Sequence, residues 1–356
     1  MKKFTTINGD DEVEWDGVVL PDVIMEDILS RLPSKTLMKL RIVCKKWKIV
    51  ISTSYFNSLH DEKSCKTPNL LLLSHIFSND AFVLTTLSLT GDVLDQWNLP
   101  LRNLEMLPSQ WGPKNLVCFV VGSKEFVLCN PSVREIFRLP RQPCSKRVGA
   151  CGFCYLPSRN QHVIISLSGG EWQMITFSCI NNLNDLHTYA WKPIKDNAPG
   201  KVMAGSRWGV SANGVLYWIG LTSSWSQCLL CLDLNKEKFF TVAWRDEIRR
   251  AFSWSLHELK GDLHLMTRRA STLSTLWKLD VTNQTWIKQY TIFMSVSNMR
   301  PLMECDDGEL MFHDGLFLKW FGLDDEVFRL RRKGYDRLPH FGHMLNIKLH
   351  NDTLFL

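Results

Sequence analysis

The sequence predicts an α+β multidomain chain, in which a small module of three helices precedes a large all-β domain whose expected architecture is a β-propeller. Three observations support this prediction. Apolar residues between positions 20 and 60 recur with helical spacing, the chain from Pro68 onward consists of short strand-like runs, and aromatic segments recur along those runs. The expected divisions are a flexible tail over residues 1–17, the helical module over 18–62 and the β domain over 66–356.

The helical module is predicted to begin at Pro21, because a proline at the first helical position loses no hydrogen bond there. Pro33 is expected to end this first helix, and Ser34 to cap the next one. In the first helix, Ile24, Ile28 and Leu32 form one apolar face. Met25 and Leu29 form an adjacent apolar stripe. A third helix is predicted from apolar residues spaced at three and four, which are Leu40, Val43, Cys44, Trp47 and Ile51.

Three helices this short bury too little surface to be stable alone. Because more than half of the first helix is apolar, it needs cover on two sides. One interpretation is a helical cap packed against the following domain. The other is a helical module whose second apolar face binds a partner chain, and the periodicity does not choose between them.

The β domain is predicted from runs of four to eight apolar, β-branched and aromatic residues between turn signals, such as KNLVCFVVG, HVIISLSGG and GVLYWIG. A stretch over 244–252 is the exception and reads as a helical turn or loop. Segments that end in an aromatic residue recur at intervals of roughly 40–55 residues, at 97–100, 134–140, 190–194, 237–244, 284–290 and 326–332. This period favours a propeller, with a pair of β-sandwiches as the alternative.

Two further features of the β domain bear on a propeller. Most of its tryptophans are expected to pack between blades, because their large area dominates core energetics. The final residues, NIKLHNDTLFL, are predicted to form a strand that pairs near 69–74 and closes the ring. The number of blades is not predicted.

The composition limits which classes of binding partner and which cellular compartment are expected. The net charge of +6 is mild for 356 residues, and no element concentrates basic residues beside base-reading side chains, so nucleic acid is not an expected partner. The basic clusters at 245–250 and 329–333 are expected to be solvated surface, with recognition of an acidic protein partner as the alternative. No apolar run is long enough to span a membrane. Eleven cysteines without a regular spacing, including Cys118, Cys129 and Cys179, and the absence of a signal-peptide core predict a cytoplasmic or nuclear protein.

No catalytic or cofactor-binding motif is present, since GxSxG, GxGxxG, P-loop and HExxH patterns are all missing. Cys151–Cys154 and Cys228–Cys231 have a zinc-like spacing. In the strand-like run around Cys228, however, an offset of three places the two thiols on opposite faces. HELKGDLH over 257–264 is predicted to be a strand, a turn at Gly261 and a second strand. We therefore predict no catalytic residue, no cofactor and no metal.

The helical module resembles the F-box over residues 20–56. The matching positions have the family's fixed spacing and comprise Leu20–Pro21, Ile28–Leu29, Leu32–Pro33, the run Val43–Cys44–Lys45–Lys46–Trp47, and Phe56. The remainder resembles the F-box-associated region of plant F-box proteins, also described as F-box/kelch. The phrases that carry this second resemblance are VLCNPSVREIFRLP, GFCYLPSRNQHVIISL, NGVLYWIG and CLDLNKEKFFTV, with Leu156–Pro157 in place of a commoner Asp–Pro.

These resemblances imply the substrate-recognition subunit of an E3 ubiquitin ligase, itself not an enzyme. The F-box would dock on a Skp-type adaptor and through it on a cullin–RING scaffold, while the kelch-like domain captures a protein substrate. The adaptor contact implied by the resemblance comprises Leu20, Pro21, Ile24, Ile28, Leu32, Pro33, Val43 and Cys44. The core of the module would be formed by Leu29, Leu37, Leu40 and Trp47. The alternative function is a non-degradative protein-interaction or ligand-sensing module.

Substrate contacts are predicted at residues of turn-like segments, because protein interfaces concentrate energy in exposed Trp, Tyr and Arg. Trp225 lies in LTSSWSQ, Trp172 follows a Gly–Gly pair, and Arg207 lies in the glycine-bounded GSRWG. The alternative for each tryptophan is packing in a groove between blades.

Overall fold

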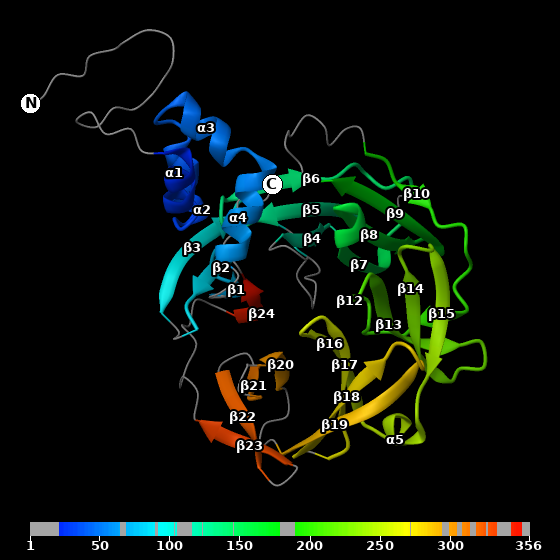
Figure 1. Ribbon diagram of the computed structural model, residues 1–356. Helices are drawn as coiled ribbons and strands as arrows, with labels where there is room; N and C mark the ends of the chain where they lie inside the picture. The colour runs from blue at the N-terminus through cyan, green and yellow to red at the C-terminus, as the bar shows by residue number, and fades with distance from the viewer. Residues whose placement is uncertain are drawn as a thin grey trace, which may run out of the picture.

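The computed structural model describes residues 21–64, 69–89, 92–102, 104, 116–122, 124–144, 146–178, 189–270, 272–293, 299–304, 308–313, 318–324, 327–332 and 343–350. Figure 1 shows a ring of β-sheets with a group of helices at its outer edge. The predicted tail over 1–17, Leu20 and Cys179 lie outside the described residues.

Four helices form the N-terminal module: α1 (Asp22–Leu29), α2 (Ser34–Leu40), α3 (Lys45–Ile51) and α4 (Ser54–Ser64). The prediction that the first helix extends to Leu32 was wrong. The N–H groups of Arg31 and Leu32 bond to carbonyls three residues back, at 3.2 and 3.0 Å, so the chain tightens as it approaches Pro33. Ser34 is not the predicted cap, because Pro33 occupies the N-cap position and Ser34 begins the helix.

The fourth helix was missed, because α4 carries few apolar residues and its helical period is weak in the sequence. Two of its side chains are nevertheless fully covered: Phe56 is 0% exposed and His60 is 2% exposed. His60 Nε2 lies 3.0 Å from the carbonyl oxygen of Leu32, which ties α4 to the connection between α1 and α2. The fourth helix therefore completes the small core that three helices could not form.

The β domain is a six-blade propeller, so the sandwich alternative is excluded. Within each of the first four sheets the neighbouring strands are antiparallel. The first sheet contains β24 (His343–His350), β1 (Asn69–Ile76), β2 (Ala81–Leu87) and β3 (Val93–Leu99), and the second β4 (Val117–Val121), β5 (Glu125–Asn130) and β6 (Glu135–Arg138). The third contains β7 (Val148–Leu156), β8 (Gln161–Ser168), β9 (Glu171–Ser178) and β10 (Lys192–Pro193). A short 3-10 turn, η2 (Pro157–Arg159), joins β7 to β8.

The fourth blade contains β11 (Gly200–Val202), β12 (Val210–Ala212), β13 (Val215–Thr222), β14 (Gln227–Asp233) and β15 (Lys238–Ala243), and α5 (Asp246–Arg249) follows it. The fifth contains β16 (Ser253–Leu259), β17 (Asp262–Arg268), β18 (Leu273–Asp280) and β19 (Thr285–Phe293). The sixth contains β20 (Arg300–Glu304), β21 (Leu310–His313), β22 (Leu318–Asp324) and β23 (Val327–Arg332). A short parallel pairing of β19 with β23 joins the outer strands of the last two blades.

The six aromatic segments found in the sequence map onto the last strand of each blade: β3, β6, β10, β15, β19 and β23. The sequence period is therefore the period of the blades. A tight turn confirms the strand–turn–strand predicted over 257–264. Lys260 and Gly261 have φ values of 49° and 85°, which is the geometry of a two-residue hairpin turn, and they join β16 to β17 as the predicted strand–turn–strand.

Ring closure is confirmed where β24 pairs antiparallel with β1, with Asn69 opposite His350 and His75 opposite His343. The first blade is thus built from both ends of the β domain (Figure 1). Apolar packing also joins the first blade to the sixth, because Leu70 and Leu72 of β1 share a cluster with Met311 and Leu318 of the sixth blade. The other blade pairs are joined by five similar clusters.

Two histidines in the fifth blade are held neutral. His257 on β16 and His264 on β17 stand opposite each other, and His264 Nε2 lies 2.9 Å from Oε1 of Gln289. Burial lowers the pKa of His257 from the ordinary 6.5 to about 3, with a further contribution from Arg300, and burial also lowers the pKa of His264. Both imidazoles therefore disfavour protonation in the folded state.

We expect the propeller to lose stability in mild acid. The folded pKa values lie below 6.5, so the unfolded chain binds protons first, and stability is retained above pH 6.5 and lost as the pH falls below it. The His257 imidazole should cost about 1 kcal/mol between about pH 6.5 and about pH 5.5, and His264 should contribute in the same direction. Urea unfolding at the two pH values measures this, and His264→Gln should show a shallower pH dependence. An unchanged dependence in that variant would contradict the assignment.

Candidate functional site

The helical module has one covered side and one uncovered side. Its core contains Leu29, Leu37, Ile51 and Phe56, each no more than 3% exposed. Half-buried side chains pack around them, among them Leu32, Leu40, Trp47 and Val50. All four residues predicted for the core, Leu29, Leu37, Leu40 and Trp47, lie in this cluster.

The uncovered side carries three of the residues implied for adaptor contact. Ile24 and Ile28 are each 49% exposed and Val43 is 58% exposed. Pro21 and Pro33 are also exposed, whereas Leu32 and Cys44 are half-buried. Cys44 is the N-cap of α3, where its Sγ accepts a hydrogen bond from the Trp47 N–H at 3.4 Å. Leu20 lies outside the described residues.

Sequence reasoning missed several exposed apolar residues of the same module: Val23 at 76%, Ile42 at 88%, Ile49 at 66% and Tyr55 at 66% exposure. Val23 and Ile42 adjoin predicted contact residues in the chain, and this adjacency was the available signal. Large apolar side chains exposed in such number on so small a module indicate a protein-binding surface.

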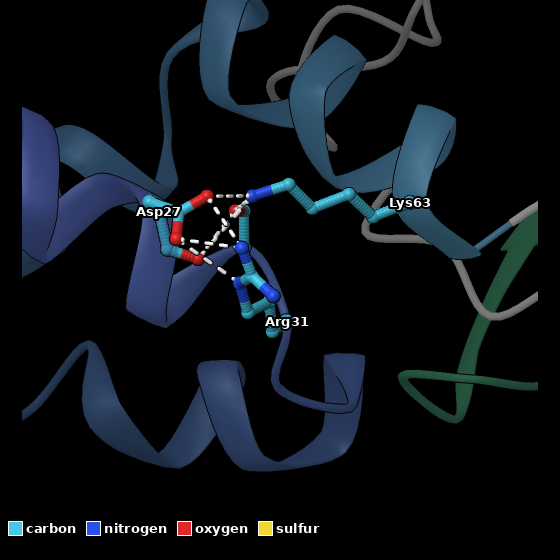
Figure 2. A network of polar contacts seen from close by, with 4 residues as sticks. Asp27, Arg31 and Lys63 are labelled. Atoms are coloured by element: carbon cyan, nitrogen blue, oxygen red, sulfur yellow. Dashed lines mark hydrogen bonds and ion pairs between the residues drawn. The ribbon is translucent and has the colours of Figure 1, made fainter.

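A polar network ties α1 to α4 (Figure 2). Lys63 Nζ donates to Asp27 Oδ1 at 2.5 Å and to Ser30 Oγ at 2.6 Å, while the Arg31 guanidinium donates to both Asp27 carboxylate oxygens at 3.0 and 3.2 Å. The hydrogen bond from Lys63, followed by those from Arg31, lowers the pKa of Asp27. The carboxylate therefore stays charged and links α1 to α4.

The other side of the module rests on the edge of the propeller. Asp95 of β3 accepts from Lys35 of α2 at 2.9 Å and from Arg134 of the β5–β6 turn at 2.8 Å. Val133 of the same turn packs against the core of the helical module. The helices therefore do pack on the following domain, as the first interpretation expects. They also carry exposed apolar residues, as the second interpretation, a face for a partner chain, requires.

The three residues predicted to contact substrate have different surroundings. Trp172 lies inside β9 rather than in a turn, is 9% exposed, and packs 5.2 Å from the rings of both Trp218 and Phe239. The Arg207 guanidinium donates hydrogen bonds to the carbonyl oxygens of Val148 and Gly149, at the start of β7. Trp225 is 74% exposed in the turn between β13 and β14. Trp172 and Arg207 thus make blade contacts, and Trp225 alone of the three is largely uncovered.

The paired cysteines are separated as the strand geometry predicts. Cys231 belongs to the cluster between the fourth and fifth blades, whereas Leu230 and Leu232 on either side of it face the third blade. Cys151 and Cys154 likewise belong to different clusters. Burial raises the pKa of all four thiols. Within the described residues, no group of three His, Cys, Asp or Glu side chains could hold a metal ion.

Together, the uncovered helical face and the closed ring of blades define a two-module protein in which a helical module is fused to a six-blade propeller. A family model for the F-box associated beta propeller domain matches residues 103–315, and the F-box domain model matches residues 19–59. The chain belongs to the family of F-box proteins with an F-box associated β-propeller domain. No enzymatic family is indicated by these matches.

The chain is similar to several proteins of Arabidopsis thaliana. It is 28% identical over 308 residues to F-box protein At1g30790, which covers 76% of this chain and 74% of the relative. It is 24% identical over 319 residues to F-box/kelch-repeat protein At3g23880, covering 84% and 87%. Among solved structures, TolB from Acinetobacter baumannii reaches a TM-score of 0.47 at 9% identity, over 83% of this chain and 72% of that one.

Proposed function

We propose that this chain is the substrate-recognition subunit of a Skp–cullin–F-box type ubiquitin ligase. The observation that carries the proposal is that Ile24, Ile28 and Val43 of the F-box stay exposed on a module that already contacts the propeller elsewhere. A Skp-type adaptor would cover this face. The adaptor in turn connects the chain to a cullin–RING scaffold that carries the ubiquitin-charged conjugating enzyme.

In this role the chain supplies no reacting group. The propeller holds a protein target, and the F-box holds the propeller on the ligase, so that a target lysine has a high effective concentration near the charged conjugating enzyme. Asp95, bound by both Lys35 and Arg134, contributes to a defined orientation between the two modules. A defined orientation favours transfer, because each degree of freedom removed before the reaction need not be lost during it.

The proposal places the chain in the cytoplasm or nucleus. Eight cysteines in the described residues are free thiols, and most of them are buried, which suits a reducing compartment. Among the described residues, no helix has the length and apolar character needed to cross a bilayer.

Adaptor binding is tested by Ile28→Asp. A charged side chain at the centre of an apolar interface is expected to cost about 2–4 kcal/mol, which is roughly 30- to 1,000-fold in affinity for a purified Skp-type adaptor by calorimetry. The matched control is Ile287→Asp, because Ile287 is 50% exposed and lies on β19 of the propeller, far from α1 in the chain. An Ile28→Asp affinity within about twofold of the unmodified chain would reject the assigned face.

A second measurement separates the ligase receptor from a binding module that does not promote ubiquitination. The cullin should co-purify with the unmodified chain and be lost with Ile28→Asp. A bound target should accumulate in cells that express Ile28→Asp but not in cells that express Ile287→Asp. Adaptor binding without the cullin, and with no change in target abundance, would favour the non-degradative function.

A further inference from the structure

The connections of the propeller divide into two sets on opposite faces of the ring. Neighbouring strands within a blade are antiparallel, so the turn between the second and third strands emerges on the same face as the connection to the next blade. In the fourth and fifth blades this face carries the β13–β14 turn, the β15–β16 connection with α5, and the β17–β18 turn. The β5–β6 turn, which contacts the helical module through Val133, opens on the other face.

Exposed aromatic side chains lie on the first of these faces. Trp225 in the β13–β14 turn is 74% exposed, and Phe252 in the β15–β16 connection is 76% exposed. Both are held by backbone hydrogen bonds: the Trp225 N–H donates to the Thr222 carbonyl at 2.9 Å and the Phe252 N–H to the Arg268 carbonyl at 2.7 Å. Ordered segments therefore present these rings to solvent.

Trp225 also has a φ of +62°, which is unusual for a bulky residue. Hydrogen bonds among the turn hydroxyls stabilise this conformation, including Thr222 Oγ1 with Ser224 Oγ at 2.8 Å and the Ser226 N–H with Thr222 Oγ1 at 3.1 Å. The turn is strained at the residue that it exposes. Such strain persists where surrounding contacts maintain it, and it is concentrated at binding sites.

Cationic side chains lie beside both rings. Lys201 lies with its ammonium 6.0 Å from the centre of the Trp225 ring. Arg249, Arg250 and Arg269 flank Phe252 in the β15–β16 connection and the β17–β18 turn, and all are exposed. Glu247 approaches Arg269 at 3.8 Å and Asp246 approaches Arg249 at 3.9 Å. No acidic side chain among the described residues pairs with Lys201 or Arg250, which leaves two cations for a ligand.

The opposite face of the same two blades has a different character. Its β14–β15 turn contains Asp233 and its β18–β19 turn contains Asp280, and each carboxylate accepts hydrogen bonds from the backbone of its own turn. Positive charge and exposed aromatic rings therefore coincide on one face of these blades. That face is also the one away from the turn that contacts the helical module.

We propose that the surface formed by Lys201, Trp225, Arg249, Arg250, Phe252 and Arg269 binds an acidic protein segment that carries an apolar side chain. The carboxylates of the segment would pair with Lys201 and Arg250, and its apolar side chain would cover Trp225 or Phe252. The inference rests on the proposed function, because it assigns the chemical class of the target that the ligase receptor captures. The paired charges would orient the bound segment and raise its association rate, and burial of the aromatic ring would provide affinity.

The test uses the full chain, with and without a Skp-type adaptor, and a short fluorescein-labelled peptide of glutamates around two central leucines. Matched peptides replace the leucines by serines or the glutamates by lysines. Fluorescence anisotropy should show that the glutamate–leucine peptide binds best and that its binding weakens as salt rises. Trp225→Ala and Arg250→Glu should each weaken binding by about tenfold or more without changing the melting temperature.

Lys238→Glu is the charge-matched control, because Lys238 is exposed at the start of β15 on the opposite face. The proposal is overturned if Lys238→Glu weakens binding as much as Arg250→Glu, or if the lysine peptide binds as well as the glutamate peptide. Tighter binding to phosphatidylserine vesicles or to poly-uridylate than to the peptide would also overturn it. Adaptor binding, measured on the same preparations, reports on the proposed function separately, since its failure would leave the peptide result unaffected.

Discussion

Replacing Trp218 by alanine is expected to destabilise the propeller by roughly 3–5 kcal/mol, the range for a fully buried large aromatic. Trp218 on β13 is 0% exposed and packs 5.2 Å from Trp172 of the third blade. Its indole N–H donates to the Cys151 carbonyl at 3.1 Å. The surroundings are shaped to this ring, because a Cβ added at Gly209 would lie 2.6 Å from the indole. The substitution would thus leave a cavity between two blades and remove one of the two hydrogen bonds that the Cys151 carbonyl accepts, the other coming from the Gly209 N–H at 2.7 Å.

The same hairpin offers a matched control. Trp225→Ala removes the same side chain from a position 74% exposed, so the change in unfolding free energy should stay within about 0.5 kcal/mol. Urea denaturation of the two variants beside the unmodified chain measures both quantities. Equal losses in the two variants would contradict the assignment of Trp218 to the joint between blades and of Trp225 to the surface.

Ending the chain after residue 342 is expected to prevent the propeller from folding as a soluble monomer. The truncation removes β24 and leaves β1 as an open edge along Asn69–His75, where every residue pair with β24 is lost. An exposed edge of this length, with buried leucines at 70–73, is a template for pairing with other chains. We expect aggregation in size-exclusion chromatography and loss of a cooperative unfolding transition.

A chain ended after His350 is the control, because it retains all of β24 as described. A synthetic peptide of residues 343–356, added during refolding, should restore a soluble monomer to the truncated chain by supplying the missing strand. Cooperative unfolding of the truncated chain, at a midpoint close to that of the control, would show that the pairing of β24 with β1 is not required for closure.

The fold class, the two modules and their family resemblance could be predicted from the sequence alone. Helical spacing identified the first module, because α1 keeps an apolar face at intervals of four. The six aromatic segments marked the last strands of the blades, because one outer strand recurs once in each repeated unit. The closing strand was also predicted, since its pairing with the first blade removes an edge that would otherwise be exposed. These features depend on local period and on repetition, which a single sequence contains.

Which side chains are buried could not be predicted from local sequence and becomes clear only in the folded chain. Trp172 and Trp225 both follow turn-like sequence, yet one is 9% and the other 74% exposed, because Trp218 and Phe239 come from the next blade to cover Trp172. α4 was missed because its helix depends on Phe56 and His60 packing against α1 and α2 rather than on its own period. The contact of Lys35 and Arg134 with Asp95 joins residues 60 and 39 positions apart in the chain. Exposure, and with it the choice between a core residue and a binding residue, depends on neighbours distant in sequence, and only the folded chain brings those together.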